Sequence, residues 1–332
     1  MHDLVIRNAS LVDGTGSTQR VSDIAVNGNT ISEVGVKLGA GKREINAEGL
    51  LLTPGWVDIH THYDGQATWD PYLAPSSWHG VTTSVFGNCG VGFAPVRPGA
   101  ERFLINLMEG VEDIPETVLA EGIDFTWESF PQYLDALETM PRIMDIGAQV
   151  PHCALRFYVM GERGADHAEV PTDGEIAEMG VLLEQSLHAG ALGFTTSRTI
   201  KHKAKDGRYT PGLSAMEREL AGLALAMKRA GSGVIEVNSD FGDGDFEKLR
   251  AAAERLGGEA VVEGIGIIDQ LPVDRHDQVA GLQSRARRRA LLGHGRDDPL
   301  TAQCRLRGLG LGAVDPRIRL VDLELHLRAR LA

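Results

Sequence analysis

Short apolar runs separated by turn residues make up the first fifty residues. The runs DLVIR, SLVD, DIAV and TISEVG alternate with the turns DGTGS and NGN. Asn27 and Gly28 stand between two of these runs, and an Asn-Gly pair there is a strong hairpin signal because both residues tolerate a positive φ. The pattern predicts a small β-unit over residues 1–54.

From Leu50 onward, strand-like runs alternate with longer segments of helical periodicity. Strands are expected in LLLTPGWVDIHTH, GVTTSVFGNCG, RIMDIGAQV, GALGFTTS and GVIEVNS. Two helices are expected to begin at S/T-x-x-E capping boxes, formed by Thr172 with Glu175 and by Ser214 with Glu217. After Thr172, apolar residues recur at helical spacing and should face a core: Ile176, Met179, Leu183 and Leu187.

Strands that alternate with helices predict a parallel sheet covered by helices, either doubly wound or closed into a (β/α)8 barrel. No phosphate-binding GxGxxG motif opens a helix after the first of these strands, which weighs against a dinucleotide-binding fold. In a barrel, functional side chains lie at the C-terminal ends of the strands. Because the residues with candidate chemistry stand at strand ends, the barrel is the better interpretation.

Two histidines stand two positions apart in VDIHTHYDGQ, residues 57–66. In a β-strand, alternate side chains face the same side, so Asp58, His60 and His62 are expected to project into one space. Two imidazoles in one space suggest a metal ion. An isolated HxH motif is weak evidence, because a histidine pair also occurs on a solvated face or hydrogen-bonded within a core.

A cysteine closes the next predicted strand in FGNCG. The two glycines of this run permit a tight turn that would present the sulfur of Cys89 at the barrel mouth. The alternative is an inert buried cysteine, which is common. Imidazole nitrogen together with thiolate sulfur is a ligand set that zinc prefers, so His60, His62 and Cys89 are the candidate ligands and Asp58 is the candidate residue that orients a histidine.

The loop SRTIKHKAKDGRYT gathers basic residues after the fourth predicted strand. Arg198 is the one best suited to a bidentate contact with a substrate carboxylate, the alternative being a solvated basic loop. His152 and His202 also stand near strand ends. Each is either a ligand or an ordinary hydrogen-bonded histidine, and neither is assigned.

Composition narrows the class of protein. The chain has 332 residues, 42% of them hydrophobic and 24% charged, which is typical of a soluble globular protein. It contains no apolar run of the roughly 20 residues that cross a bilayer and no basic-then-apolar leader, so a cytoplasmic location is expected. A net charge of −13 disfavours nucleic acid as a partner and leaves a small molecule. Three scattered cysteines indicate a reducing compartment: Cys89, Cys153 and Cys304.

Several of these segments, in order, resemble the N-acyl-D-amino-acid deacylases (D-aminoacylases) of the amidohydrolase superfamily. They are DLVIRNASLVDGTG, PGWVDIHTHYD, HGVTTSVFGNCGVGFAP, HCALRFYVMG and HAGALGFTTSRT, and the resemblance covers roughly residues 1–257. It implies a β-sandwich flanking a metal-dependent (β/α)8 barrel that hydrolyses the amide of N-acylated D-amino acids. It also implies that His60, His62 and Cys89 bind zinc, as one or two ions.

Two departures from that family pattern stand out. The family has a further metal histidine at the end of the fifth strand, where GVIEVNSD offers Glu236, Asn238 and Asp240 instead, with the two acids as candidate ligands of a hard ion. The family also has a general-base aspartate late in the barrel. The late residues His276, His294 and Asp315 lack its sequence context.

The composition changes near residue 258. Residues 275–332 hold twelve arginines against six acidic residues, and VVEGIGII is the one strand-like run after that point. A complete barrel takes about 250 residues, so an incomplete barrel over 55–258 and an atypical tail over 259–332 are expected. Our hypothesis for the tail is an out-of-frame or foreign segment that interrupts a longer enzyme. The alternative is a basic interaction arm.

The sequence therefore predicts a zinc-dependent amidohydrolase that releases a D-amino acid from an N-acyl precursor. One alternative is a cyclic amidase of the same superfamily, such as a hydantoinase-like enzyme. GALGFTTS has no lysine before Lys201 that would supply a carbamylated bridge. The other alternative is an inactive fragment or a non-catalytic metal-binding protein, which the missing general base favours.

Overall fold

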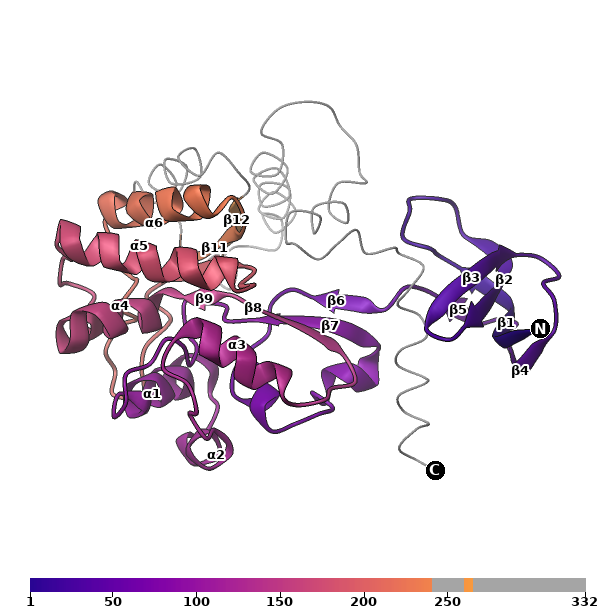
Figure 1. Ribbon diagram of the computed structural model, residues 1–332, viewed down its shortest axis with the longest axis horizontal. Coiled ribbons are helices and arrows are strands. Elements are labelled where there is room, and N and C mark those ends of the chain that lie inside the picture. Colours follow the sequence, from indigo (N-terminus) through magenta and orange to yellow (C-terminus); the bar gives the residue numbers. More distant parts are fainter. Residues whose placement is uncertain (241–259, 265–332) are drawn as a thin grey trace, which may run out of the picture.

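The structure is a computed structural model that describes residues 1–240 and 260–264 (Figure 1). Its strands are β1 (His2–Leu11), β2 (Arg20–Asn27), β3 (Thr30–Gly35), β4 (Gly41–Asn46), β5 (Leu51–Leu52), β6 (Trp56–Asp58), β7 (Val81–Phe86), β8 (Asp145–Ala148), β9 (Val150–Pro151), β10 (Gly193–Arg198), β11 (Val234–Ser239) and β12 (Ala260–Gly264). Its α-helices are α1 (Glu101–Glu112), α2 (Glu116–Gly122), α3 (Phe130–Glu138), α4 (His152–Met160), α5 (Asp173–His188) and α6 (Glu217–Ala230).

The first five strands form one mixed sheet in the order β3-β2-β1-β4, with β5 pairing β1. Strands β1 and β2 are antiparallel, whereas β1 and β4 are parallel. The alternating apolar residues of these strands make a small core of their own: Leu4, Ile6, Ala9, Leu11, Ile24, Val26, Ile31 and Ala47. The predicted β-unit is therefore present, and its place in a sandwich stays a prediction.

The predicted hairpin joins β2 to β3. Asn27 pairs with Thr30 across it, and Gly28 has a φ of +59°, in the left-handed region that glycine adopts without a steric penalty. The Asn-Gly signal is confirmed.

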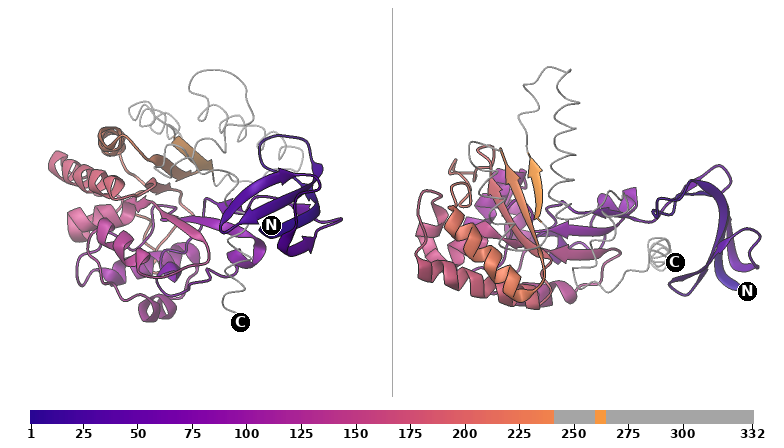
Figure 2. Two further views of the ribbon diagram at one scale, coloured as in Figure 1. Left: turned by 45° about the vertical axis from the view of Figure 1, so that its right-hand side comes forward. Right: turned by 90° about the horizontal axis from the view of Figure 1, so that it is seen from above.

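The remaining strands are all parallel. Two sheets have the orders β6-β7-β8 and β9-β10-β11-β12. Only Gln149 separates β8 from β9, and its backbone N–H donates to the carbonyl of Phe86 at 2.9 Å. Strands β8 and β9 therefore follow one another along the same extended segment. Figure 1 and the right-hand view of Figure 2 show the N-terminal sheet to one side of these parallel strands.

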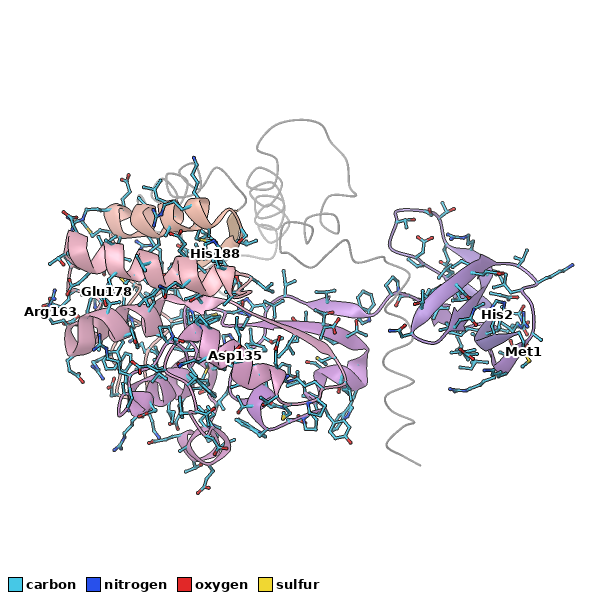
Figure 3. The ribbon with its side chains drawn as sticks, in the orientation of Figure 1. Met1, His2, Asp135, Arg163, Glu178 and His188 are labelled. Carbon is cyan, nitrogen blue, oxygen red and sulfur yellow. The ribbon has the colours of Figure 1, made fainter. Side chains whose placement is uncertain are left out.

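Helices α4, α5 and α6 stack beside one another on one side of the parallel strands (Figure 1). The α5 stripe predicted to face the core does so, with exposed fractions of 7% or less for Ile176, Met179, Leu183 and Leu187. The other face of α5 is in solvent, where Glu178 and His188 project outward (Figure 3). The described part of the chain contains no helix that is both long and apolar enough to span a bilayer.

One of the two predicted capping boxes forms. Thr172 accepts a hydrogen bond from the backbone N–H of Glu175, and the Glu175 carboxylate accepts one from the backbone N–H of Thr172. The box predicted for Ser214 is wrong, because α6 begins at Glu217 with Met216 as its N-cap. Ser214 lies too far ahead of the first turn to reach its free N–H groups, and its hydroxyl instead contacts Nδ1 of His167 at 2.9 Å.

The chain is therefore an α/β protein with a parallel sheet, as its sequence predicts, and β12 overlaps the strand-like run VVEGIGII. Closure into a (β/α)8 barrel stays a prediction. Apart from β12, the proposed tail over 259–332 lies outside the described residues, as do His276, His294 and Asp315.

Candidate metal centre

His60, His62 and Cys89 come together at the C-terminal ends of β6 and β7. One donor atom from each lies within 4.8 Å of the donors of the other two. Nε2 of His60 is 3.2 Å from the sulfur of Cys89, and the two imidazoles meet edge to face with ring centroids 5.4 Å apart. The convergence predicted from the HxH motif and the strand-end cysteine is present in the structure.

The segment that carries the histidines is tied to the end of β7. The Thr61 hydroxyl donates to the carbonyl of Val85 at 2.8 Å, and the Thr61 N–H donates to the same carbonyl at 3.0 Å. Oδ1 of Asp58 accepts from the backbone N–H of His60 at 3.3 Å. Asp58 therefore holds the backbone of His60, which helps to set the position of that imidazole.

A tight turn after β7 carries Cys89. Gly87, Cys89 and Gly90 all have positive φ angles, of 82°, 55° and 68°. A Cβ at Gly87 would lie 2.1 Å from the carbonyl oxygen of Gln149, so glycine is required there. The Thr195 hydroxyl of β10 donates to the Gly87 carbonyl and accepts from the Gly90 N–H, which closes the turn from the neighbouring strand.

Cys89 is only 3% exposed. Its sulfur faces His60 and the amide of Asn238 rather than open solvent, because the turn folds back over the strand ends. The turn itself was predicted from the two glycines, whereas the enclosed position of the sulfur depends on residues far away in the chain.

Two residues that the sequence did not assign complete the cluster. Glu112, the last residue of α1, places Oε1 3.1 Å from Nε2 of His62. His202 lies in the loop after β10, and its Nδ1 contacts the hydroxyl of Ser197 at 2.9 Å. Donor atoms of Cys89, Glu112 and His202 form a second group within 4.8 Å of one another. Glu112 carries no sequence signal, because it belongs to a helix rather than to a strand end.

Strand β11 supplies an acid and an amide where the family pattern has a histidine. Oε1 of Glu236 lies 3.6 Å from Nδ1 of His60, and Nδ2 of Asn238 lies 3.1 Å from the Cys89 sulfur. These two residues alternate along the strand and therefore face the same side. Asp240 follows the strand and instead accepts hydrogen bonds from Thr199 and Ile200.

A series of buried side-chain hydrogen bonds supports the cluster. Nε2 of Gln149 donates to Oε2 of Glu236 at 2.6 Å and to Oδ1 of Asn88 at 2.8 Å. Asn88 in turn donates to the carbonyls of Thr61 and Val85. Because this chain links β11 to β7 and to the histidine segment, it fixes the spacing of the candidate ligands.

Burial shapes the protonation of these groups. It lowers the pKa of His62 to about 3, with His60 and His202 adding to the effect, and it lowers the pKa of His202 to about 4. It raises the pKa of Glu112 to about 7 and also raises the pKa of the Cys89 thiol. These two imidazoles are therefore neutral near pH 7, each with one unprotonated ring nitrogen, whereas the thiol must release a proton when it binds a cation.

The donors fit a zinc-type ion. Imidazole nitrogen, thiolate sulfur and carboxylate oxygen are the ligand types of zinc sites. Within the described residues, Nδ1 of His62 and Oδ1 of Asn238 are buried polar atoms without a hydrogen-bond partner. Buried polar atoms without partners are rare in folded proteins and mark places where an ion or water is expected.

Arg198 and His152 contact residues outside this cluster. Arg198 is 5% exposed, and its Nη1 donates to the carbonyl of Ala215 at 2.7 Å. His152 is fully buried and contacts the Thr196 hydroxyl and the Glu219 carboxylate, which supports the hydrogen-bonded alternative for this histidine. The role of Arg198 in substrate binding stays a prediction.

Comparison with protein families gives a match to one described as "Amidohydrolase family" over residues 43–305. The chain is 33% identical to D-aminoacylase of Alcaligenes xylosoxydans xylosoxydans over 195 residues, which are 58% of this chain and 37% of the relative. It is 36% identical to N-acyl-D-aspartate deacylase of the same organism over 197 residues, 58% of this chain and 36% of the relative. The chain thus spans little more than a third of either relative.

Solved structures of deacylases are also similar to this chain. A D-aminoacylase structure superposes with a TM-score of 0.66 at 26% identity, covering 86% of this chain and 56% of that chain. N-acyl-D-glutamate deacylase of Bordetella bronchiseptica superposes with a TM-score of 0.61 at 25% identity, covering 87% and 56%. That enzyme was crystallised with zinc and a phosphonate inhibitor that mimics the tetrahedral intermediate.

Proposed function

The chain belongs to the amidohydrolase family, and from this premise we propose that it hydrolyses the amide of N-acyl-D-amino acids with a zinc ion held by His60, His62 and Cys89. The products are a carboxylate and a D-amino acid. Three relatives support the substrate class by their names: D-aminoacylase, N-acyl-D-aspartate deacylase and N-acyl-D-glutamate deacylase.

The observation that carries the proposal is the meeting of three zinc-type donors at the ends of adjacent parallel strands. The donor atoms of His60, His62 and Cys89 lie within 4.8 Å of one another, although Cys89 follows the next strand, β7. Catalytic groups of (β/α)8 enzymes are found at this end of the strands.

Bound zinc supplies two things that amide hydrolysis needs at neutral pH, a polarised carbonyl and an activated water. The surrounding residues of the chain orient the candidate metal ligands. Glu236, itself held by Gln149, lies beside Nδ1 of His60, so Nε2 is the nitrogen of His60 that faces Cys89. Asp58 accepts a hydrogen bond from the backbone N–H of His60.

Hydrolysis also requires a group that accepts the proton of water and returns it to the departing amine. The described part of the chain places two carboxylates beside the imidazoles, Glu112 at 3.1 Å from His62 and Glu236 at 3.6 Å from His60. Either lies where it can receive such a proton. The aspartate that serves this role in the resembling enzymes has no assigned counterpart here.

The test is to incubate the full chain, loaded with zinc, with N-acetyl derivatives of D-methionine, D-aspartate and D-glutamate and to measure the released D-amino acid. We expect release from at least one D-substrate, none from its L-enantiomer, and loss of release on chelation or in His60→Asn. The variant Asn46→Ala, altered in the N-terminal sheet, serves as a control that keeps activity.

Two outcomes would contradict the proposal. Zinc binding without release from any acylated D-amino acid would favour a non-catalytic metal-binding protein. Ring opening of hydantoins, with no release from linear amides, would favour a cyclic amidase.

A further inference from the structure

Two hydroxyl side chains of β10, Thr195 and Ser197, stand two positions apart and therefore lie on the same side of the strand. The Thr195 hydroxyl closes the turn that carries Cys89. The Ser197 hydroxyl lies 2.9 Å from Nδ1 of His202. The side of β10 that positions the candidate ligand Cys89 therefore also positions the imidazole of His202.

The loop that carries His202 is fixed on both flanks. Before it, the backbone N–H of Ile200 donates to the carboxylate of Asp240 at 2.8 Å. After it, the backbone N–H of Lys205 donates to the carbonyl of Asn106 at 3.0 Å. One flank is thus tied to the end of β11 and the other to α1. A loop anchored at two places holds its side chain in one position, as a catalytic group requires.

His202 lies beside the candidate zinc ligands. One of its ring nitrogens lies within 4.8 Å of donor atoms of Cys89 and Glu112. Because the Ser197 hydroxyl contacts Nδ1, Nε2 is the nitrogen left to contact a further group. A serine hydroxyl can donate to Nδ1, and the imidazole then carries its proton on Nε2. In that tautomer, His202 offers an N–H donor at the edge of the candidate metal centre.

Amide hydrolysis needs such a donor. The tetrahedral intermediate carries negative charge on the former carbonyl oxygen, and a donor fixed beside that oxygen stabilises the charge. A neutral imidazole serves this purpose in other enzymes, where its N–H polarises the carbonyl of the substrate. Among the imidazoles of the cluster, His60 and His62 are committed to the ion, which leaves His202 to supply the N–H.

We propose that His202 donates a hydrogen bond from Nε2 to the carbonyl oxygen of the substrate and stabilises the oxyanion that forms there. Ser197 is the positioning residue, because its hydroxyl fixes the tautomer and the orientation of the ring. The inference rests on the proposed function, since it takes an N-acyl amide as the group that reacts beside His60, His62 and Cys89.

The test uses the zinc-loaded full chain and phosphonate analogues of N-acetyl-D-methionine, N-acetyl-D-aspartate and N-acetyl-D-glutamate. In each analogue, a tetrahedral phosphorus with an anionic oxygen replaces the scissile carbonyl group. Isothermal titration calorimetry gives the Kd of the analogue, and release of the D-amino acid gives kcat and KM separately. Zinc content and circular dichroism are measured for every variant.

The variants are His202→Ala and Ser197→Ala. The matched control is His167→Ala, because Nδ1 of His167 also contacts a serine hydroxyl, that of Ser214, at 2.9 Å. Two variants on different elements keep the test decisive if one of them fails to fold.

We expect His202→Ala to lower kcat by about 10²–10³-fold, with little change in KM or zinc content. It should raise the Kd of the phosphonate in parallel, because a transition-state analogue depends on contacts that strengthen in the transition state. Ser197→Ala should show a smaller loss of kcat, again with KM and zinc content unchanged. His167→Ala should match the wild-type chain.

Three results would overturn the inference. Loss of zinc from His202→Ala would make His202 a metal ligand. Wild-type kcat and phosphonate Kd in His202→Ala would remove its catalytic role, while release of the D-amino acid by the wild-type chain keeps the proposed function. A wild-type chain that binds no phosphonate and releases no D-amino acid would remove the proposed function and the inference together.

Discussion

The amide nitrogen of Asn238 lies 3.1 Å from the sulfur of Cys89, although 149 positions separate the two residues in the chain. This contact brings β11 into the cluster at the place where the family pattern has a histidine. An amide that donates to a metal-binding sulfur stabilises the thiolate and orients it. Asn238 therefore contacts the candidate ligand Cys89, while its own Oδ1 has no hydrogen-bond partner in the described part of the structure.

Asn238→Ala is expected to weaken metal binding by about tenfold or more, because the buried thiolate loses its amide donor. Asn238→His is expected to strengthen binding, because it adds an imidazole beside Cys89. Isothermal titration with zinc measures both changes, and Asn46→Ala in the N-terminal sheet is the control. Unchanged affinity in both variants would show that β11 does not contribute to the site.

Metal removal is expected to lower the thermal stability of the chain. A ligand that binds only the folded state at 100 times its dissociation constant adds about 2.7 kcal/mol to the free energy of unfolding. Differential scanning calorimetry with zinc and with a chelator measures the shift in Tm. A variant with both His60→Asn and His62→Asn should show a much smaller shift, and an equal shift would place the stabilising ion elsewhere.

Thr195→Val should disturb the Cys89 turn. The valine leaves the Gly87 carbonyl and the Gly90 N–H without their buried partner, which costs about 1–3 kcal/mol of unfolding free energy. Thr195→Ser keeps the hydroxyl and should restore both stability and zinc affinity. Thr82→Val is the matched control, because within the described residues the buried Thr82 hydroxyl has no hydrogen-bond partner. Equal effects at both positions would contradict a specific role for Thr195.

Glu219→Gln should destabilise the chain strongly. The Glu219 carboxylate pairs with the guanidinium of Arg156 at 2.9 Å, and both side chains are 1% exposed, so the change leaves a buried cation without its counter-charge. The expected cost is about 3–5 kcal/mol. The surface pair of Arg229 and Glu184 provides the comparison, where Glu184→Gln should cost about 1 kcal/mol or less. Urea unfolding measures both, and similar losses would contradict the prediction.

The contribution of His152 to stability should fall as the pH falls below about 6.5. Burial lowers the pKa of His152 from 6.5. Between the unfolded and folded pKa values, His152 is therefore protonated in the unfolded chain and neutral in the folded chain. The stabilisation is present above the unfolded value and is lost as the pH falls through the folded value. Burial alone would raise the pKa of Glu219, but His152 and Arg156 lower it, which extends the loss to lower pH.

Urea midpoints at pH 7.5 and pH 5.5, measured with a chelator present, test this dependence. His152→Gln should lose less stability between pH 7.5 and pH 5.5 than the wild-type chain, whereas the contributions of His62, His202 and Glu112 remain in both chains. Midpoints in His152→Gln that change between pH 7.5 and pH 5.5 in the same way as those of the wild-type chain would contradict the prediction.

The sequence by itself determined the features that depend on near neighbours. Thr172 and Glu175 form their capping box because both partners stand in one helical turn. Asn27 and Gly28 make a hairpin for the same local reason. His60 and His62 were recognisable as candidate ligands because alternation along an extended segment places them on one side.

Only the tertiary structure decided which distant groups meet these residues. Glu112 enters the cluster because α1 ends beside the histidines, and periodicity within a helix does not report where its end points. Alternation along β11 puts Glu236 and Asn238 on a common face, but the pairing of β10 with β11 decides that this face points at Cys89. A hydrophobic pattern sets which residues are buried, whereas the contacts among buried polar groups follow from how the strands pair across long separations in the chain.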